Sequence, residues 1–184
     1  AKQYPIIDSA ILNDKSEAGF KGNKKLGRGI YLLGYPNKNG FFEVLMDFNQ
    51  QFSISIDSSK SLGGIKFTNS PYNTEFNAYQ RYMSEKGASI NTARNKLAAA
   101  SKADSAKLNE EIRATDIAIA KYRDSLIKKN PTGILSRLLK GMEEPIVPPT
   151  ELHPGGKYDT AYAYRYYKNN FWNGVDFWDD LFAR

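Results

Sequence analysis

Short apolar runs separated by turn-forming residues occupy the first third of the chain. In one of them, Phe52, Ile54 and Ile56 alternate with polar residues, which is the period-two pattern of a strand with one solvated face. The other runs lie at residues 6–12, 30–35, 41–48 and 65–68. Short strands at spacings of roughly 8–12 residues are typical of antiparallel folds. The pattern therefore predicts an antiparallel β sheet or sandwich over residues 1–69.

The pattern changes to a heptad repeat after the first 70 residues. The first apolar series comprises Tyr72, Phe76, Tyr79, Met83, Ile90 and Leu97, and the second comprises Leu108, Ile112, Thr115, Ile119, Tyr122 and Leu126. Steps of three, four and seven residues place each series on one helix face. We therefore expect a long antiparallel helix hairpin over residues 72–129, with a capping box from Ser101 to Asp104. Two helices of roughly 26–28 residues reach about 40 Å, long enough to project from a small domain.

Proline and glycine divide the remainder of the chain into three segments. Pro131 ends the hairpin, and a short amphipathic helix follows at residues 132–141. We expect the proline-rich connector at residues 142–157 to be extended and exposed. Residues 158–184 form an aromatic-rich helical segment, with a helix around residues 160–171. This segment stops in mid-pattern within an aromatic stretch, so we expect the chain to be truncated at its C-terminus.

Together these elements predict an α+β fold with two parts. An N-terminal antiparallel β sheet or sandwich at residues 1–69 is followed by a mainly helical domain at residues 70–184, which contains the long antiparallel helix hairpin. For a mass of 20.7 kDa, the folded chain should expose roughly 8,900 Å². The unfolded chain exposes far more surface than this, so folding buries enough of it to support a real core, in one or two domains.

Composition and charge narrow the functional classes. The chain has no cysteine, which excludes a disulfide scaffold, a thiolate metal site and a cysteine nucleophile. Its formal charge of +6 is split evenly, +3 in residues 1–69 and +3 in residues 70–184. A nucleic-acid-binding protein usually concentrates its basic residues on one face, so we expect no nucleic-acid partner. No apolar run approaches the ~20 residues of a transmembrane helix, so we expect no transmembrane segment.

The residues that suggest catalysis or metal binding each have a structural interpretation. His153, the one histidine, lies in the proline-rich connector and is interpreted as a solvated loop residue. The Gly-Arg-Gly motif at residues 27–29 precedes a strand instead of opening a helix, so it predicts a turn and not a phosphate loop. The acidic group Asp176, Asp179 and Asp180 suits helix capping or solvation better than a metal. We therefore assign no catalytic, cofactor-binding or metal-binding residue.

The aromatic segment suggests a different kind of site. Sugars and single-stranded bases stack on exposed aromatic rings, and the chain concentrates such rings between residues 158 and 182. The candidate ligand or partner contacts are Trp172, Trp178, Tyr164 and Tyr167. The alternative is that these rings pack on the rest of the domain, because a buried aromatic ring removes about 150–250 Å² from water.

Several sequence strings together resemble a known family. They are DSA at residues 8–10, GFKG at 19–22, GIYLLGYPNKNGFFEVLMD at 29–47, QFSISID at 51–57, IKFTNSPYNTEFNAYQ at 65–80 and KNNFWNGVDFWDDLFAR at 168–184. Their order resembles the region ahead of the thioredoxin-like domain in envelope thiol-disulfide oxidoreductases of Bacteroidetes-type bacteria. In that family, a small β domain and a helical domain of unknown function precede a thioredoxin-like domain of the peroxiredoxin/ResA type. Asn69 stands where the junction between those two domains usually has glycine.

The resemblance implies a non-catalytic accessory or interaction region, which positions or selects partners for a thioredoxin-like domain lying outside this chain. The redox C-x-x-C of such proteins belongs to that later domain, so no catalytic residue and no cofactor carry over to this piece. Whether the parent is a thiol-disulfide oxidoreductase stays open.

The resemblance also implies a location and partners. We expect an exported parent in the periplasm or outer cell envelope, with or without a lipid anchor. Its expected partners are the thioredoxin-like domain and protein substrates, and a homodimer is also open. The alternative function is a stand-alone glycan- or peptide-binding module that uses the aromatic segment 158–182.

Overall fold

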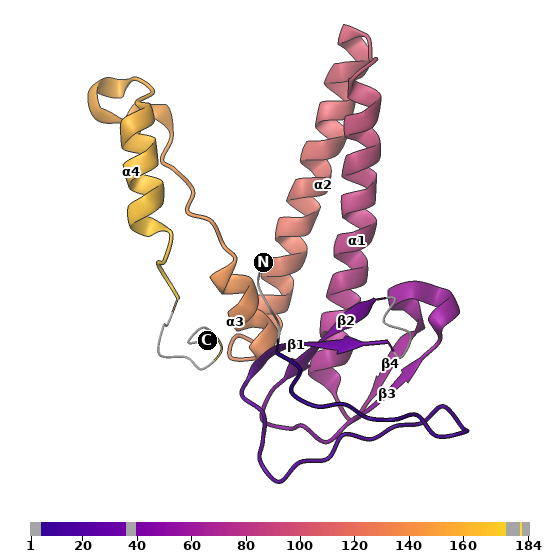
Figure 1. The fold of residues 1–184 in the computed structure, drawn as a ribbon. Helices are drawn as coiled ribbons and strands as arrows, with labels where there is room; N and C mark the ends of the chain where they lie inside the picture. Colours follow the sequence, from indigo (N-terminus) through magenta and orange to yellow (C-terminus); the bar gives the residue numbers. More distant parts are fainter. Residues whose placement is uncertain (1–4, 36–39, 176–180, 182–184) are drawn as a thin grey trace.

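The computed structural model describes residues 5–35, 40–175 and 181, and within them the fold is α+β, as predicted. Two small antiparallel sheets come first along the chain, and four α-helices follow (Figure 1). The strands are β1 (Gly29–Gly34), β2 (Phe41–Met46), β3 (Ser53–Ile56) and β4 (Ile65–Thr68). The helices are α1 (Pro71–Leu97), α2 (Lys102–Lys129), α3 (Ile134–Gly141) and α4 (Thr160–Asn170).

Each sheet pairs two antiparallel strands, β1 with β2 and β3 with β4. Directly opposed residues, such as Ile54 and Phe67, place their side chains on the same face. The apolar faces of the two sheets meet in one cluster, with Phe42, Val44 and Ile65 buried at its centre. The predicted strands at residues 30–35, 41–48, 51–57 and 65–68 are thus confirmed, apart from small differences at their ends.

The predicted strand at residues 6–12 is wrong. Ile6 and Ile11 are 88% and 95% exposed, and no residue of this segment belongs to a strand. A strand needs a neighbouring backbone for its N–H and C=O groups, whereas the hydrogen bonds next to this segment are local. Asn13, for example, forms a turn in which its side-chain oxygen accepts from two backbone N–H groups at 2.9 Å each. Apolar content alone is therefore insufficient to make this segment a strand.

Asn73 attaches α1 to the outer edge of β2. The helix begins with Pro71, which suits the first helical position, and the side chain of Asn73 in its first turn is 0% exposed. The amide oxygen of Asn73 accepts the N–H of Leu45 at 2.8 Å, and its nitrogen donates to the C=O of Leu45 at 2.9 Å. The same nitrogen donates to Ser70 Oγ at 2.9 Å. Asn73 therefore supplies the hydrogen bonds that a neighbouring strand would give.

The helix hairpin has the predicted length, with 27 residues in α1 and 28 in α2. Every residue of the two predicted heptad series is buried or half-buried. Ser101 Oγ accepts the N–H of Asp104 at 3.2 Å and donates to its carboxylate at 2.6 Å, so these two residues cap α2 as predicted. The hairpin projects far beyond the sheets, a point that the sequence left open (Figure 1).

A second apolar cluster, the basal cluster, packs the base of the hairpin. Its buried residues are Leu45, Phe76, Tyr79, Leu126, Ile134, Leu135 and Leu139. The ring of Tyr122 extends it, since its centroid lies 6.4 Å from that of Tyr79 and 4.3 Å from that of Tyr82. Because β2, α1, α2 and α3 all contribute, apolar packing is continuous across residues 69 and 70, where the sequence predicts a domain boundary.

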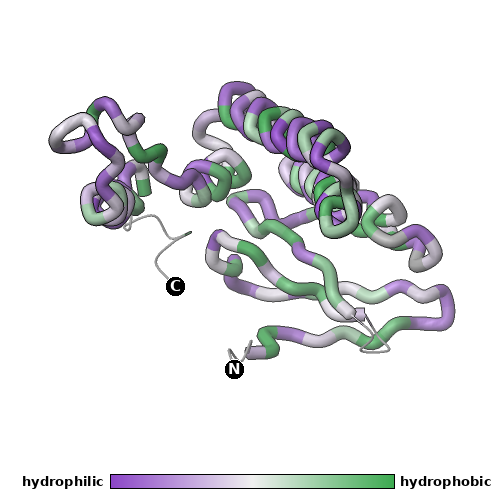
Figure 2. Tube along the Cα trace, turned by 90° about the horizontal axis from the view of Figure 1, so that it is seen from above, coloured by the Kyte–Doolittle hydropathy of each residue, from purple (hydrophilic) through white to green (hydrophobic). Residues whose placement is uncertain are grey.

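The helices α3 and α4 lie close to their predicted positions. The connector between them is only partly extended, because two short 3-10 turns interrupt it at Thr150–Leu152 and Pro154–Gly156. Both views place α4 apart from the hairpin and the sheets (Figure 1 and Figure 2). Across the described ranges, no helix combines the length and the apolar content needed to cross a membrane.

We expect Asn73→Ala to lower the free energy of unfolding by about 2–4 kcal/mol. The substitution leaves the N–H and C=O of Leu45 buried without partners, and each such group costs roughly 1–3 kcal/mol. Chemical denaturation followed by circular dichroism measures the loss. Asn95→Ala, at an exposed position of the same helix, is the matched control and should change stability by less than about 0.5 kcal/mol. Equal effects of the two variants would contradict the role of Asn73.

Candidate functional site

The C-terminal quarter of the chain forms an arm, which we define as residues 142–175. The arm leaves the hairpin base after α3, passes through the connector and turns back along α4 (Figure 1). The chain then returns at Leu181, which packs against the basal cluster. Within the described residues, neither apolar cluster contains an arm residue. The arm is therefore a substructure with packing of its own.

His153 is the centre of the packing in the arm. It is 4% exposed and lies between the rings of Tyr158 and Tyr162, whose centroids are 5.4 and 4.7 Å away. Nδ1 of His153 accepts the N–H of Asp159 at 3.1 Å, so in the neutral ring Nε2 carries the proton and donates to the C=O of Pro148 at 2.9 Å. The imidazole therefore joins the connector to the start of α4 through both of its nitrogens.

The interpretation of His153 as a solvated loop residue is wrong, and so is the expectation that the whole connector is exposed. The physical reason is a tight turn directly after His153. Gly155 and Gly156 have φ values of 74° and 64°, a conformation that glycine adopts at little cost. This turn directs the chain back, so that the following tyrosines cover the imidazole. The pair of glycines was the signal in the sequence that could have predicted it.

Asp159 caps α4 and starts its aromatic face. The carboxylate accepts the N–H groups of Ala161 at 2.8 Å and of Tyr162 at 3.1 Å. The hydrogen bond from Tyr162, and then that from Ala161, hold the pKa of the Asp159 carboxyl below its usual range. One turn further on, Tyr166 lies against Tyr162 with ring centroids 6.1 Å apart. The ordered rings of the arm thus continue from His153 along one side of the helix.

The structure separates the four predicted contact residues. Tyr164 and Trp172 are exposed, at 65% and 56%, whereas Tyr167 is half-buried. Phe171 lies between two of them, with ring centroids 5.4 Å from Tyr167 and 4.7 Å from Trp172. Trp178 lies outside the described residues. The arm therefore offers Tyr164 and Trp172 as contact residues, while Tyr167 supports the ring next to Trp172.

The arm exposes further large apolar side chains. They are Met142, Ile146, Leu152 and Tyr158, each more than half exposed. Exposed apolar side chains that gather on one substructure are typical of interaction surfaces. The acidic group interpreted as capping or solvated, Asp176, Asp179 and Asp180, lies outside the described residues. The described arm thus exposes apolar and aromatic side chains among charged ones such as Glu143, Arg165 and Lys168.

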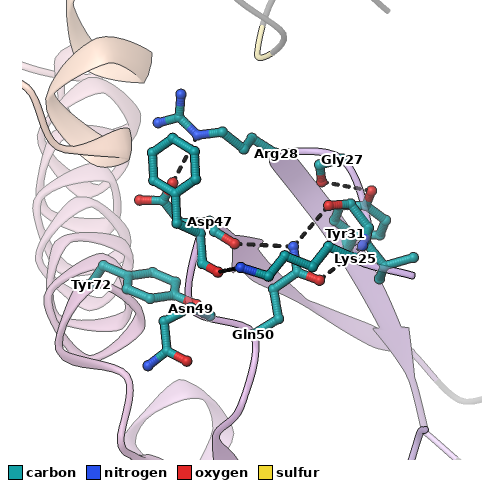
Figure 3. Close-up of polar contacts among 10 residues, drawn as sticks. Lys25, Gly27, Arg28, Tyr31, Asp47, Asn49, Gln50 and Tyr72 are labelled. Atoms are coloured by element: carbon teal, nitrogen blue, oxygen red, sulfur yellow. Dashed lines mark hydrogen bonds and ion pairs between the residues drawn. The ribbon is translucent and has the colours of Figure 1, made fainter. Parts of the chain in front are cut away.

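A polar network at the end of β2 is the second candidate site, and the sequence interpretation missed it (Figure 3). Arg28 Nε donates to Asp47 Oδ1 at 2.8 Å, and the two side chains are only 13% and 18% exposed. The Arg28 guanidinium also lies over the ring of Phe48, 4.5 Å from its centroid. A pair withdrawn from solvent is screened less than a surface pair, so this contact holds the two segments firmly.

The network joins the loops at residues 25–28 and 47–50. The side-chain oxygen of Gln50 accepts the N–H of Leu26 at 2.9 Å, and its nitrogen donates to the C=O of Leu26 at 2.8 Å. From α1, the Tyr72 hydroxyl donates to the C=O of Asn49 in the second loop. Burial raises the pKa of the Tyr72 phenol. Each of these groups is directed at protein (Figure 3), so the network fixes loops and offers little to a ligand.

The hairpin carries two shallow hollows between α1 and α2, of about 320 and 470 Å³. Both are lined by Ser89, Ala93 and Glu111, and the larger one is also lined by Glu85. Among the described residues, two carboxyl groups have a lowered pKa, and both lie outside these hollows. Asp57 owes its lowered pKa first to the Ser59 side chain, and Asp159 owes it to the cap of α4. The described residues thus form no cleft with paired, perturbed acids of the kind that acid–base catalysis uses.

Comparison of the chain with protein-family models, curated proteins and solved structures gives no match. The arm and the hairpin are therefore the features of the described structure that bear on function.

His153→Ala should loosen the arm and leave the sheets and hairpin intact. The change removes the acceptor for the Asp159 N–H and the ring between two tyrosines. Amide hydrogen exchange in α4, measured by NMR, should accelerate by about 10–100-fold, which corresponds to about 1.4–2.8 kcal/mol. Glu151→Ala, exposed in the neighbouring turn, is the control. Acceleration that extends evenly through α1 and α2 would contradict the separateness of the arm.

The stability of α4 should fall in acid because of Asp159. Its folded-state pKa lies below the ordinary value of 3.8, so the ionised cap stabilises the helix above that pH. This stabilisation is lost as the pH falls through the lowered pKa. Backbone carbon chemical shifts of α4, followed from neutral pH into acid, report the loss. Asp159→Asn keeps a capping oxygen without a titrating group and should abolish the dependence, whereas an unchanged dependence would assign it to another residue.

Proposed function

We propose that this chain is a non-catalytic interaction region, which positions or selects partners for a thioredoxin-like domain lying outside this sequence. The observation that carries the proposal is the extent of the surface. The chain exposes 13935 Å², whereas a compact monomer of 20.7 kDa exposes about 8,900 Å². The excess of about 5,000 Å² exceeds the ~1,600 Å² that a standard protein–protein interface buries. A chain of this size thus has unusual room for partners.

The hairpin and the arm supply this surface. The hairpin projects from the sheets, and the arm stands to one side, so each is accessible from several directions (Figure 1 and Figure 2). Both are attached at the basal cluster, so a partner could contact them without disturbing the buried residues. On the arm, Tyr158, Tyr164 and Trp172 are exposed rings, and aromatic residues are enriched among those that dominate binding energy.

A thioredoxin-like partner is supported by the strings that resemble the envelope oxidoreductases. The absence of cysteine from the sequence agrees with a division of labour, in which this chain binds and the other domain carries the thiols. On this proposal, the parent protein is exported to the periplasm or outer cell envelope, with or without a lipid anchor.

The exposed rings of the arm also support a second candidate function, the binding of a glycan or peptide by the arm itself. Tyr164 and Trp172 both present more than half of their surface to solvent. Under this alternative, the chain would bind on a glycan array, and Trp172→Ala would weaken binding without loss of helical content. Tyr162→Ala, which removes a packed ring, should instead loosen the arm.

The primary proposal is tested with the coding sequence downstream of this chain. We expect it to encode a thioredoxin-like domain with a C-x-x-C motif, which can be produced and titrated with this chain by calorimetry. The double substitution Tyr164→Ser with Trp172→Ser should weaken the complex by at least about tenfold. Ile117→Ser, at a 44% exposed position of α2, is the matched control for lost apolar surface.

Two results would count against the proposal. The first is the lack of a thioredoxin-like domain in the downstream coding sequence, which removes the expected partner. The second is a titration in which the arm variants and Ile117→Ser bind alike, which removes the arm from the interface.

A further inference from the structure

The outer edge of β1 has free backbone groups. The N–H of Tyr35 donates to the C=O of Gly40 at 3.0 Å, which makes these opposed residues a hydrogen-bonded pair. Such pairs alternate along an antiparallel ladder, so in β1 the residues opposite β2 bonds are 29, 31 and 33. The N–H and C=O groups of Ile30, Leu32 and Gly34 must therefore point away from β2. Leu45, which lies opposite Ile30, agrees with this orientation. The N–H and C=O of Leu45 point away from β1 and bond to Asn73.

These outward groups lack protein partners among the described residues. Every strand pairing of β1 is to β2, and no other backbone or side-chain hydrogen bond reaches Ile30, Leu32 or Gly34. The side chains of Ile30 and Leu32 are 48% and 37% exposed and lie on the same face of the sheet. Proteins usually protect such an edge with lysine, proline or a bulge, but GIYLLG contains no charge and no proline.

We propose that the outer edge of β1 is a dimer interface, occupied by β1 of a second copy of this chain in antiparallel orientation. A two-fold axis at Leu32 places Leu32 opposite Leu32 of the second copy. In the same register, Ile30 of each copy lies opposite Gly34 of the other. All three outward residues of β1 then form hydrogen-bonded pairs. The β1–β2 sheet of one copy and that of the other thereby become one sheet of four strands.

The sequence of β1 favours a second copy over an unrelated peptide, because the strand is self-complementary. Glycine stands at both ends and apolar residues stand between, so each Ile30 meets a position without a side chain. Like charges do not oppose one another, since the strand is neutral and the nearby Arg28 is paired with Asp47. The exposed Ile30 and Leu32 of the two copies bury one another. The proposed interface contains neither Tyr164 nor Trp172, so this inference is independent of the proposed function.

Engineered cysteines test both the dimer and its register, because the chain has none of its own. Residues in a hydrogen-bonded pair have Cα atoms about 5.5 Å apart, within the range that a disulfide spans. Leu32→Cys should therefore give a covalent dimer on oxidation. Ile30→Cys is the matched control, on the same strand and face and more exposed. In the proposed register, residue 30 of one copy is offset from residue 30 of the other by four residues, which is about 13 Å along the strands. The Ile30→Cys variant should therefore remain monomeric on a non-reducing gel.

Sedimentation equilibrium of the unmodified chain gives the second measurement. We expect a mass of two chains, and Leu32→Lys should weaken the dimer by at least about tenfold because it places like charges opposite one another. A single-chain mass at the highest soluble concentration would overturn the proposal. So would equal cross-linking of Ile30→Cys and Leu32→Cys, which shows non-specific contact, or a monomer whose edge binds a free GIYLLG peptide. If Leu32→Lys loses helical content, the cysteine pair decides alone.

Discussion

The fold depends on how β2 satisfies the hydrogen bonds of its outer edge. In a two-stranded sheet every strand is an edge strand, so half of its backbone groups have no partner within the sheet. At β2 the Asn73 amide meets this need, since it bonds both the N–H and the C=O of Leu45. The same contact sets α1 against the sheet. With α1 placed, Phe76 and Tyr79 lie over Leu45, and α2 and α3 complete the basal cluster.

The arm satisfies its polar groups in the same way, with a side chain in the place of backbone. The connector contains four prolines, and each lacks the backbone N–H that regular structure would use. The imidazole of His153 donates to one backbone group and accepts from another, as a peptide unit would. Tyr158 and Tyr162 then cover it and provide the apolar packing that the prolines lack. Two single side chains, Asn73 and His153, thus organise the two parts of the molecule.

Local patterns predicted most of the fold, and non-local contacts account for what they missed. The heptad series and the cap at Ser101 depend on residues three or four positions apart, so the sequence displays them directly. Residues 6–12 have the composition of a strand, but a strand also depends on a partner that sequence pattern does not show. The bonds from Asn73 to Leu45 and from Arg28 to Asp47 span 28 and 19 residues, and no periodicity marks them. Among the candidate contacts, composition does not distinguish Tyr164 from Tyr167, because it does not tell which ring packs against a neighbour, as Tyr167 does against Phe171.

The return of the chain at Leu181 limits where the arm can lie. The arm leaves next to Leu139 and comes back to the same cluster about 40 residues later. Closing a flexible loop of that length costs about 3 kcal/mol or more in entropy, whereas burying one leucine completely gains about 1.5–3 kcal/mol. Leu181 is only half-buried, so it could not hold an unstructured loop closed by itself. The turn at His153 and the helix α4 order the arm internally, and this order lowers the entropy cost that the attachment of the arm to the basal cluster has to offset.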